Sequence, residues 1–169
     1  MNIQKKQYAV LFVCLGNICR SPLAEAIFQK KISENNLTHV FTCDSCGTGD
    51  YHIGQQPDPR TQAVAKKHHV PINHQCRQLR TSDFEAFDRI IAMDESNRKN
   101  ILWKGGSSIQ EKVWLMRAFD PEGGDEVPDP YRGNEKDFEE VYQILDRAID
   151  SLIRELVKDK EITAPKSEV

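Results

Sequence analysis

The chain has 169 residues, of which 38% are hydrophobic and 29% are charged, and its net charge is −3 at pH 7. This length supports one domain with a sizeable core. No segment approaches the about 18 consecutive apolar residues that a membrane-spanning helix needs, and the slight acidity argues against general nucleic-acid binding. The five cysteines are an odd number and none follows residue 76, which favours reduced thiols in the cytoplasm over a secreted disulfide framework.

Charge is distributed unevenly along the chain. Residues 1–80 contain 10 basic and 5 acidic residues, whereas residues 81–169 contain 13 basic and 21 acidic residues. An anion-binding site is therefore expected in the first half of the chain.

The hydrophobic pattern predicts strands that alternate with helices. In chain order it predicts a strand over 8–14, a helix over 22–35, a strand over 41–46, a helix over 60–69, a short helix with a capping box at Ser82, a strand over 89–93, a helix from Asp94 to about 103, a strand over 113–116 and a final helix capped by Asn134. The first strand is continuously apolar, which is typical of a strand buried on both faces of a parallel sheet.

This alternation predicts an α/β fold, a three-layer αβα sandwich with a four-stranded parallel sheet and helices on both faces. We expect a flexible N-terminal extension over residues 1–7, one domain over 8–157 and a disordered tail over 158–169. Residues 120–134 form a long loop rich in glycine, proline and acids, which is typical of a functional or mobile segment. Ligands of such sheets bind beyond the carboxyl ends of the strands.

The loop after the first predicted strand, residues 14–22, has the sequence CLGNICRSP. Gly16 and Asn17 tolerate a left-handed backbone, so the loop can curl with its N–H groups inward and bind an anion at the start of the next helix. The same field favours the thiolate form of Cys14, and Arg20 offers a planar fork for two phosphoryl oxygens. The pattern therefore predicts a sulfur nucleophile beneath a bound phosphate.

Over residues 13–22 the sequence resembles the phosphate-binding loop of the low-molecular-weight protein tyrosine phosphatases. Four more segments match that family's motifs in order and spacing: Asp44-Ser45, Tyr51-His52-Ile53-Gly54, Met93-Asp94-Glu95-Ser96-Asn97 and Asp129-Pro130-Tyr131. The resemblance covers residues 8–157 and implies a Rossmann-like or flavodoxin-like fold. It also implies phosphotyrosine-containing proteins as substrates, inorganic phosphate as product, no metal or organic cofactor, and a monomer or weak dimer.

The resemblance implies a role for each site residue. Cys14 attacks phosphorus, Arg20 stabilises the charge on the phosphoryl group, and Asp129 protonates the leaving oxygen before it activates water. Spacing alone does not decide whether Asp129 is a turn residue or this catalytic acid. The substrate-binding residues implied by the resemblance are Leu15, Gly16, Asn17, Ile18, Cys19, Ser21, Tyr51 and Tyr131. Ser45 and His74 are expected to support the loop, Ser45 beside Asn17 and His74 near Asp44.

Two departures from the family pattern lie at the expected rim of the site. Arg132 replaces a tyrosine that the family often has, and the segment Gly47-Thr48-Gly49-Asp50 is unusual. We expect Arg132 to favour acidic residues beside the phosphotyrosine. Cys19 is expected to trap oxidised Cys14 as a reversible disulfide.

Several alternatives remain open. One is a protein-arginine phosphatase of the same superfamily, but these usually carry threonine where this chain has Ile18, which favours an aryl phosphate. Another is an arsenate reductase of this fold, but these need thiols late in the chain, and no cysteine follows Cys76. A metal or redox module could use Cys43 and Cys46, but their odd separation in a strand directs them to opposite faces. A non-catalytic phosphate-binding module is the remaining alternative.

Overall fold

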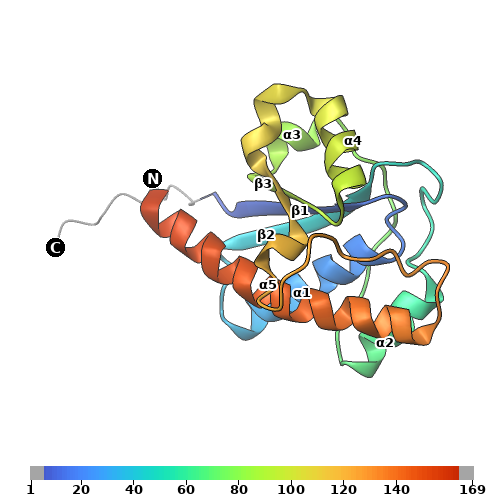
Figure 1. Cartoon of the computed structure of the whole chain (residues 1–169). Helices are drawn as coiled ribbons and strands as arrows, with labels where there is room; N and C mark the ends of the chain where they lie inside the picture. Colours follow the sequence, from blue (N-terminus) through green and yellow to red (C-terminus); the bar gives the residue numbers. More distant parts are fainter. Residues whose placement is uncertain (1–5, 164–169) are drawn as a thin grey trace.

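The computed structural model describes residues 6–163, and four parallel strands form its central sheet in the order β2-β1-β3-β4 (Figure 1). The α/β class and the parallel sheet are confirmed. The strands are β1 (Tyr8–Cys14), β2 (Phe41–Gly47), β3 (Arg89–Ala92) and β4 (Val113–Leu115).

Helices cover both faces of this sheet (Figure 1). On one face lie α1 (Arg20–Glu34), α2 (Pro59–Lys67) and α5 (Glu135–Thr163), with the short 3-10 helix η2 (Met116–Phe119) against α5. The other face carries α3 (Asp83–Ala86), α4 (Glu95–Gly105) and the 3-10 helix η1 (Ser107–Lys112). Within residues 6–163, no helix is long and apolar enough to cross a membrane.

Two hydrophobic cores are separated by the sheet, and β1 contributes to both. Val10 and Phe12 pack with α1 and α5, whereas Leu11 and Val13 pack beneath α4 and η1. Side chains alternate between the faces of a strand, so a central strand covered on both sides needs apolar residues at every position. This burial explains the uninterrupted apolar sequence of β1.

Two helix caps predicted from the sequence, Asp94 and Asn134, are confirmed. Asp94 accepts a hydrogen bond from the backbone N–H of Asn97 at 2.7 Å, which begins α4. Asn134 accepts from the N–H of Lys136 at 3.0 Å, and its own N–H donates to Asp137 at 2.7 Å. This reciprocal pair begins α5.

The expected capping box at Ser82 is wrong. Ser82 has a helical backbone and its side chain makes no capping hydrogen bond. Asp83, the next residue, is buried and instead accepts hydrogen bonds from Arg77 at 2.9 and 3.1 Å. A tertiary ion pair therefore organises this short helix.

The boundary expected at residue 157 is also wrong, because α5 continues to Thr163. Asp159 accepts hydrogen bonds from the Tyr8 hydroxyl and from Arg89, both at 2.8 Å, and these contacts hold the last turns against the sheet. The rest of the expected tail, 164–169, and residues 1–5 of the expected extension lie outside the described residues.

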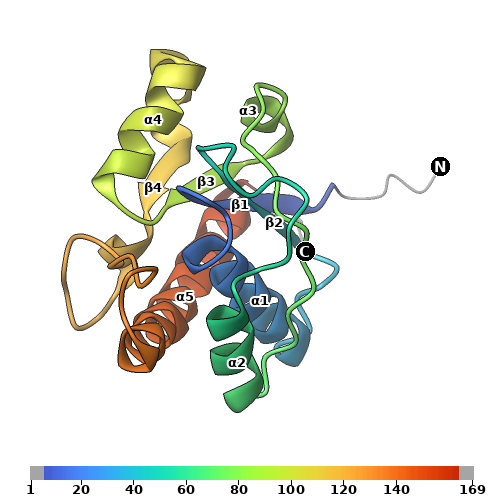
Figure 2. The same ribbon diagram turned by 90° about the vertical axis from the view of Figure 1, so that its right-hand side faces the viewer.

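Figure 2 looks at the carboxyl end of β1, with loop residues 47–58 on one side and 120–134 on the other. β2 and β3 flank β1, so the chain crosses from one side of β1 to the other. This is the position at which open parallel sheets bind ligands.

Candidate active site

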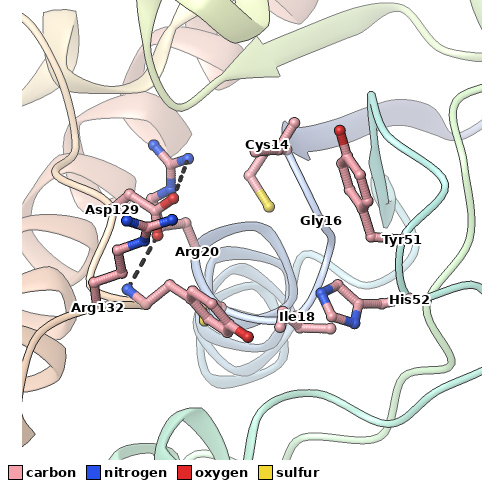
Figure 3. A pocket seen from close by; sticks show the side chains of 11 residues that line it. Cys14, Gly16, Ile18, Arg20, Tyr51, His52, Asp129 and Arg132 are labelled. Atoms are coloured by element: carbon pink, nitrogen blue, oxygen red, sulfur yellow. Dashed lines mark hydrogen bonds and ion pairs between the residues drawn. The ribbon is translucent and has the colours of Figure 1, made fainter.

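The loop between β1 and α1 curls around the sulfur of Cys14 (Figure 3). The backbone N–H of Asn17 donates to this sulfur over 3.3 Å, and the hydroxyl of Ser21 lies 3.0 Å from it. Asn17 makes the curl with φ of 57°, a left-handed conformation that asparagine tolerates. Backbone donors and the start of α1 together create a positive field at the sulfur.

The side chain of Asn17 holds the loop from beneath. Its Nδ2 donates to the hydroxyls of Ser21 at 2.8 Å and Ser45 at 3.0 Å, and its Oδ1 accepts from the N–H of Arg77 at 3.0 Å. Asn17, Ser21 and Ser45 are buried, so these hydrogen bonds are shielded from water. The structure thus places Asn17 beside Ser45, as expected.

His74 extends this network outward. Its Nε2 lies 2.7 Å from Oδ1 of Asn17, and its Nδ1 lies 3.1 Å from Glu25 and 3.8 Å from Asp44. Glu25, Asp44 and His74 bring one potential metal-ligand atom each to within 4.8 Å of one another. Both ring nitrogens of His74 face side-chain partners, Nε2 toward Asn17 and Nδ1 toward Glu25, so we assign this cluster a supporting role for the loop.

Arg20 is 2% exposed and directs its guanidinium toward three acceptors. Nη1 donates to Asp94 at 2.7 Å and to the carbonyl of Val127 at 3.0 Å, and Nη2 lies 3.6 Å from Asp129. Burial alone would lower the pKa of Arg20, but the facing Cys14 and the two carboxylates outweigh burial and raise it. Arg20 therefore stays charged and fixed in orientation.

A cavity of about 570 Å³ opens above the loop (Figure 3). The side chain of Asp129 is 46% exposed and faces this cavity beside Arg20, while its Oδ1 accepts from the N–H of Tyr131 at 3.2 Å. Tyr51 and Tyr131 form exposed aromatic walls. The complete lining is Cys14, Leu15, Gly16, Ile18, Cys19, Arg20, Tyr51, His52, Asp129, Tyr131 and Arg132.

The other four cysteines are Cys19, Cys43, Cys46 and Cys76. Burial raises the pKa of Cys19 to about 12 and that of Cys76 to about 11, and it also raises the pKa values of Cys43 and Cys46. Cys43 packs on the α1 side of the sheet and Cys46 on the α4 side. The expected opposite directions of this pair are confirmed, and a shared metal site is excluded for it.

A family model described as "low molecular weight phosphotyrosine protein phosphatase" matches residues 9–162. The chain belongs to this family. The phosphatase of this name from Gallus gallus is 46% identical over 137 residues, 80% of this chain and 87% of that protein. The one from Schizosaccharomyces pombe is 46% identical over 144 residues, 83% of this chain and 92% of that protein.

Several solved structures share the fold of this chain. A protein tyrosine phosphatase from Entamoeba histolytica is 42% identical with a TM-score of 0.88, covering 91% of this chain and 99% of its own. YfkJ from Bacillus subtilis is 34% identical with a TM-score of 0.87, covering 92% and 98%. The YwlE arginine phosphatase, 24% identical with a TM-score of 0.82 over 90% and 98%, shares the fold.

Within this phosphatase fold, the predicted site residues divide into two groups. Most line the cavity, whereas four lie beneath the loop: Asn17, Ser21, Ser45 and His74. Sequence reasoning missed Asp94 as the partner of Arg20 and His52 as a lining residue, although both lie in segments that match the family's motifs. Arg132 is exposed and lines the cavity. Its preference for acidic residues stays a prediction, as does the disulfide between Cys14 and Cys19.

Proposed function

We propose that this protein hydrolyses phosphotyrosine in proteins, and small aryl phosphates, through a phosphocysteine intermediate on Cys14. The observation that carries the proposal is the convergence of three groups on one cavity. Asp129 is more than one hundred residues away from Cys14 and Arg20 in the chain, yet all three line the same cavity. A nucleophile, a fixed cation and an acid are the groups that cysteine-based phosphoryl transfer needs.

In the first step the thiolate of Cys14 attacks phosphorus and the bond from phosphorus to the aryl oxygen breaks. Asp129 gives its proton to that oxygen, so the leaving group departs as a neutral phenol. Arg20 and the backbone N–H groups of the loop stabilise the charge on the equatorial oxygens.

In the second step water attacks the phosphocysteine. The carboxylate of Asp129 takes a proton from this water, the phosphorus–sulfur bond breaks, and inorganic phosphate and the Cys14 thiolate are released. The hydroxyl of Ser21, at 3.0 Å, donates to the departing thiolate and so stabilises it.

The walls of the cavity favour an aromatic substrate. Ile18, Tyr51 and Tyr131 present apolar surface to the space in front of Cys14. A phenyl ring can stack against such walls, whereas burying a charged phosphoguanidinium against Ile18 costs free energy. Phosphoarginine is therefore the competing substrate that the test must include.

The test compares hydrolysis of a phosphotyrosyl peptide, para-nitrophenyl phosphate and a phosphoarginyl peptide. We expect the parent to hydrolyse the two aryl phosphates, Cys14→Ser to be inactive, and Asp129→Ala to lose about 100- to 1000-fold in kcat. Cys43→Ser is a matched control, because Cys43 lies on the sheet face outside the cavity. Full activity in Cys14→Ser, or preferred hydrolysis of phosphoarginine, contradicts the proposal.

A further inference from the structure

Asp129 lies in a short segment that is held on both sides. Before it, the carbonyl of Val127 accepts a hydrogen bond from Arg20 at 3.0 Å. After it, the carbonyl of Tyr131 accepts from Arg60 at 2.9 Å. Only three residues separate these two held carbonyls, and two of the three are prolines with restricted backbones. The orientation of the Asp129 carboxylate therefore depends on both contacts.

Arg60 belongs to α2, and its guanidinium contacts the segment 127–133 that carries Asp129, the acid segment. Nη2 donates to the carbonyl of Tyr131, and Nη1 donates to the carbonyl of Gly133 at 3.3 Å. The group also lies over the ring of Phe138, with 4.5 Å from Cζ to the ring centre. A planar fork with donors in fixed directions can hold two carbonyls at once, which a lysine cannot do in the same way.

Asp58 fixes Arg60 in this orientation. Its carboxylate accepts from Nε of Arg60 at 3.0 Å and from Nη2 at 2.9 Å, and it also caps α2 by accepting from the backbone N–H of Arg60 at 2.8 Å. The N–H of Asp58 in turn donates to the carbonyl of Ile18 at 2.8 Å. A continuous chain of contacts thus runs from the phosphate loop through Asp58 and Arg60 to Tyr131.

We propose that Arg60, oriented by Asp58, is a positioning residue that sets the distance between the phosphate loop and the acid Asp129. This inference rests on the proposed function of Asp129 as proton donor. Proton transfer requires hydrogen-bond distance to the leaving oxygen, and a displacement of about 1 Å can cost about 100-fold in rate. Arg60 touches no reacting atom and acts through the backbone that carries Asp129.

The experiment uses Arg60→Gln and Asp58→Asn in the full chain. Asparagine keeps the cap of α2 but removes the charge that orients Arg60. We measure kcat/KM on phenyl phosphate, whose leaving oxygen needs a proton, and on dinitrophenyl phosphate, whose leaving oxygen hardly needs one. Both variants should lose about tenfold on phenyl phosphate and less than about twofold on dinitrophenyl phosphate, with unchanged inhibition by inorganic phosphate.

Amide hydrogen exchange gives a second readout that does not depend on activity. Exchange in residues 129–133 should be at least about tenfold faster in Arg60→Gln, while residues 15–21 keep the parent rate. Arg89→Gln is the matched control. Arg89, at the amino-terminal end of β3, also pairs with an aspartate, Asp159, and lies over an aromatic ring, that of Trp114. It should leave both readouts unchanged.

The outcomes separate this inference from the proposed function. Equal losses on both substrates, or unchanged exchange in residues 129–133, overturn the positioning role of Arg60 even if the parent is active. A parent that hydrolyses no aryl phosphate, together with faster exchange in Arg60→Gln, rejects the proposed function and supports the structural contact alone.

Discussion

Asn17 combines a left-handed backbone, with φ of 57°, and a side chain that bonds to four neighbours. Glycine would adopt this backbone conformation more easily, but it could not hold the loop from beneath. Alanine could do neither. The residue type at this position therefore follows from two requirements, one local and one tertiary.

Two substitutions separate these requirements. Asn17→Gly should lower the free energy of unfolding by about 2 kcal/mol, because buried hydroxyls lose their partner. Asn17→Ala should cost about 1 kcal/mol more, since alanine is strained in the left-handed region. Urea denaturation measures both. Asn36→Gly is the control, because Asn36 has φ of 56° but is exposed, and it should change stability little. Parent-like stability of Asn17→Gly would show that the network contributes nothing.

Among the elements, the start of α5 determines where the acid loop, residues 120–134, ends. Asn134 and Asp137 cap this helix reciprocally, one residue after the carbonyl of Gly133 that Arg60 holds. The loop therefore passes from a held segment directly into a 29-residue helix.

Loss of this cap should affect stability. We expect Asn134→Ala to lower the free energy of unfolding by about 1 kcal/mol, because an N–H at the helix start loses its acceptor. Asn134→Asp, which keeps an acceptor, should retain most of the parent stability. Equal unfolding midpoints in urea for the two variants would count against the capping role.

At the scale of the molecule, Asp120 joins the start of the acid loop to α5 and η2. Its carboxylate accepts from Arg147 at 2.8 and 3.1 Å and from Arg117 at 3.2 Å, and also from the backbone N–H of Glu122 at 3.0 Å. Burial alone would raise the pKa of Asp120, but these donors outweigh it and hold the pKa below its ordinary value.

This shift predicts a sign for the pH dependence of stability. A carboxyl with a lowered pKa in the folded state stabilises the fold above its unfolded-state pKa of about 4, and the contribution is lost as the pH falls through the folded-state value. Urea denaturation at pH 7 and pH 3 should show a smaller difference in unfolding free energy for Asp120→Asn than for the parent. Asp125→Asn, an exposed aspartate of the same loop, should behave like the parent. A parent-like difference in Asp120→Asn would contradict the assignment.

Local sequence was enough to predict the order of elements, the burial of β1 on both faces and the phosphate loop, because these depend on neighbouring residues and on which faces are apolar. Residues 14–22 are contiguous, so their backbone chemistry can be read locally. The family resemblance then selected Asp129 from a loop whose spacing left it undecided.

The partners of these groups are set by how distant parts of the chain fold together. Arg20 and Asp94 are 74 residues apart and Arg60 and Tyr131 are 71 apart, so no local pattern records their contacts. Side-chain pairing also overrode local signals. The ion pair between Arg77 and Asp83, six residues apart, formed where a cap was expected at Ser82. Long-range contacts from Tyr8 and Arg89 hold α5 beyond the expected boundary. Local propensity is worth less free energy than buried, charge-assisted contacts, and those contacts form only when distant segments meet.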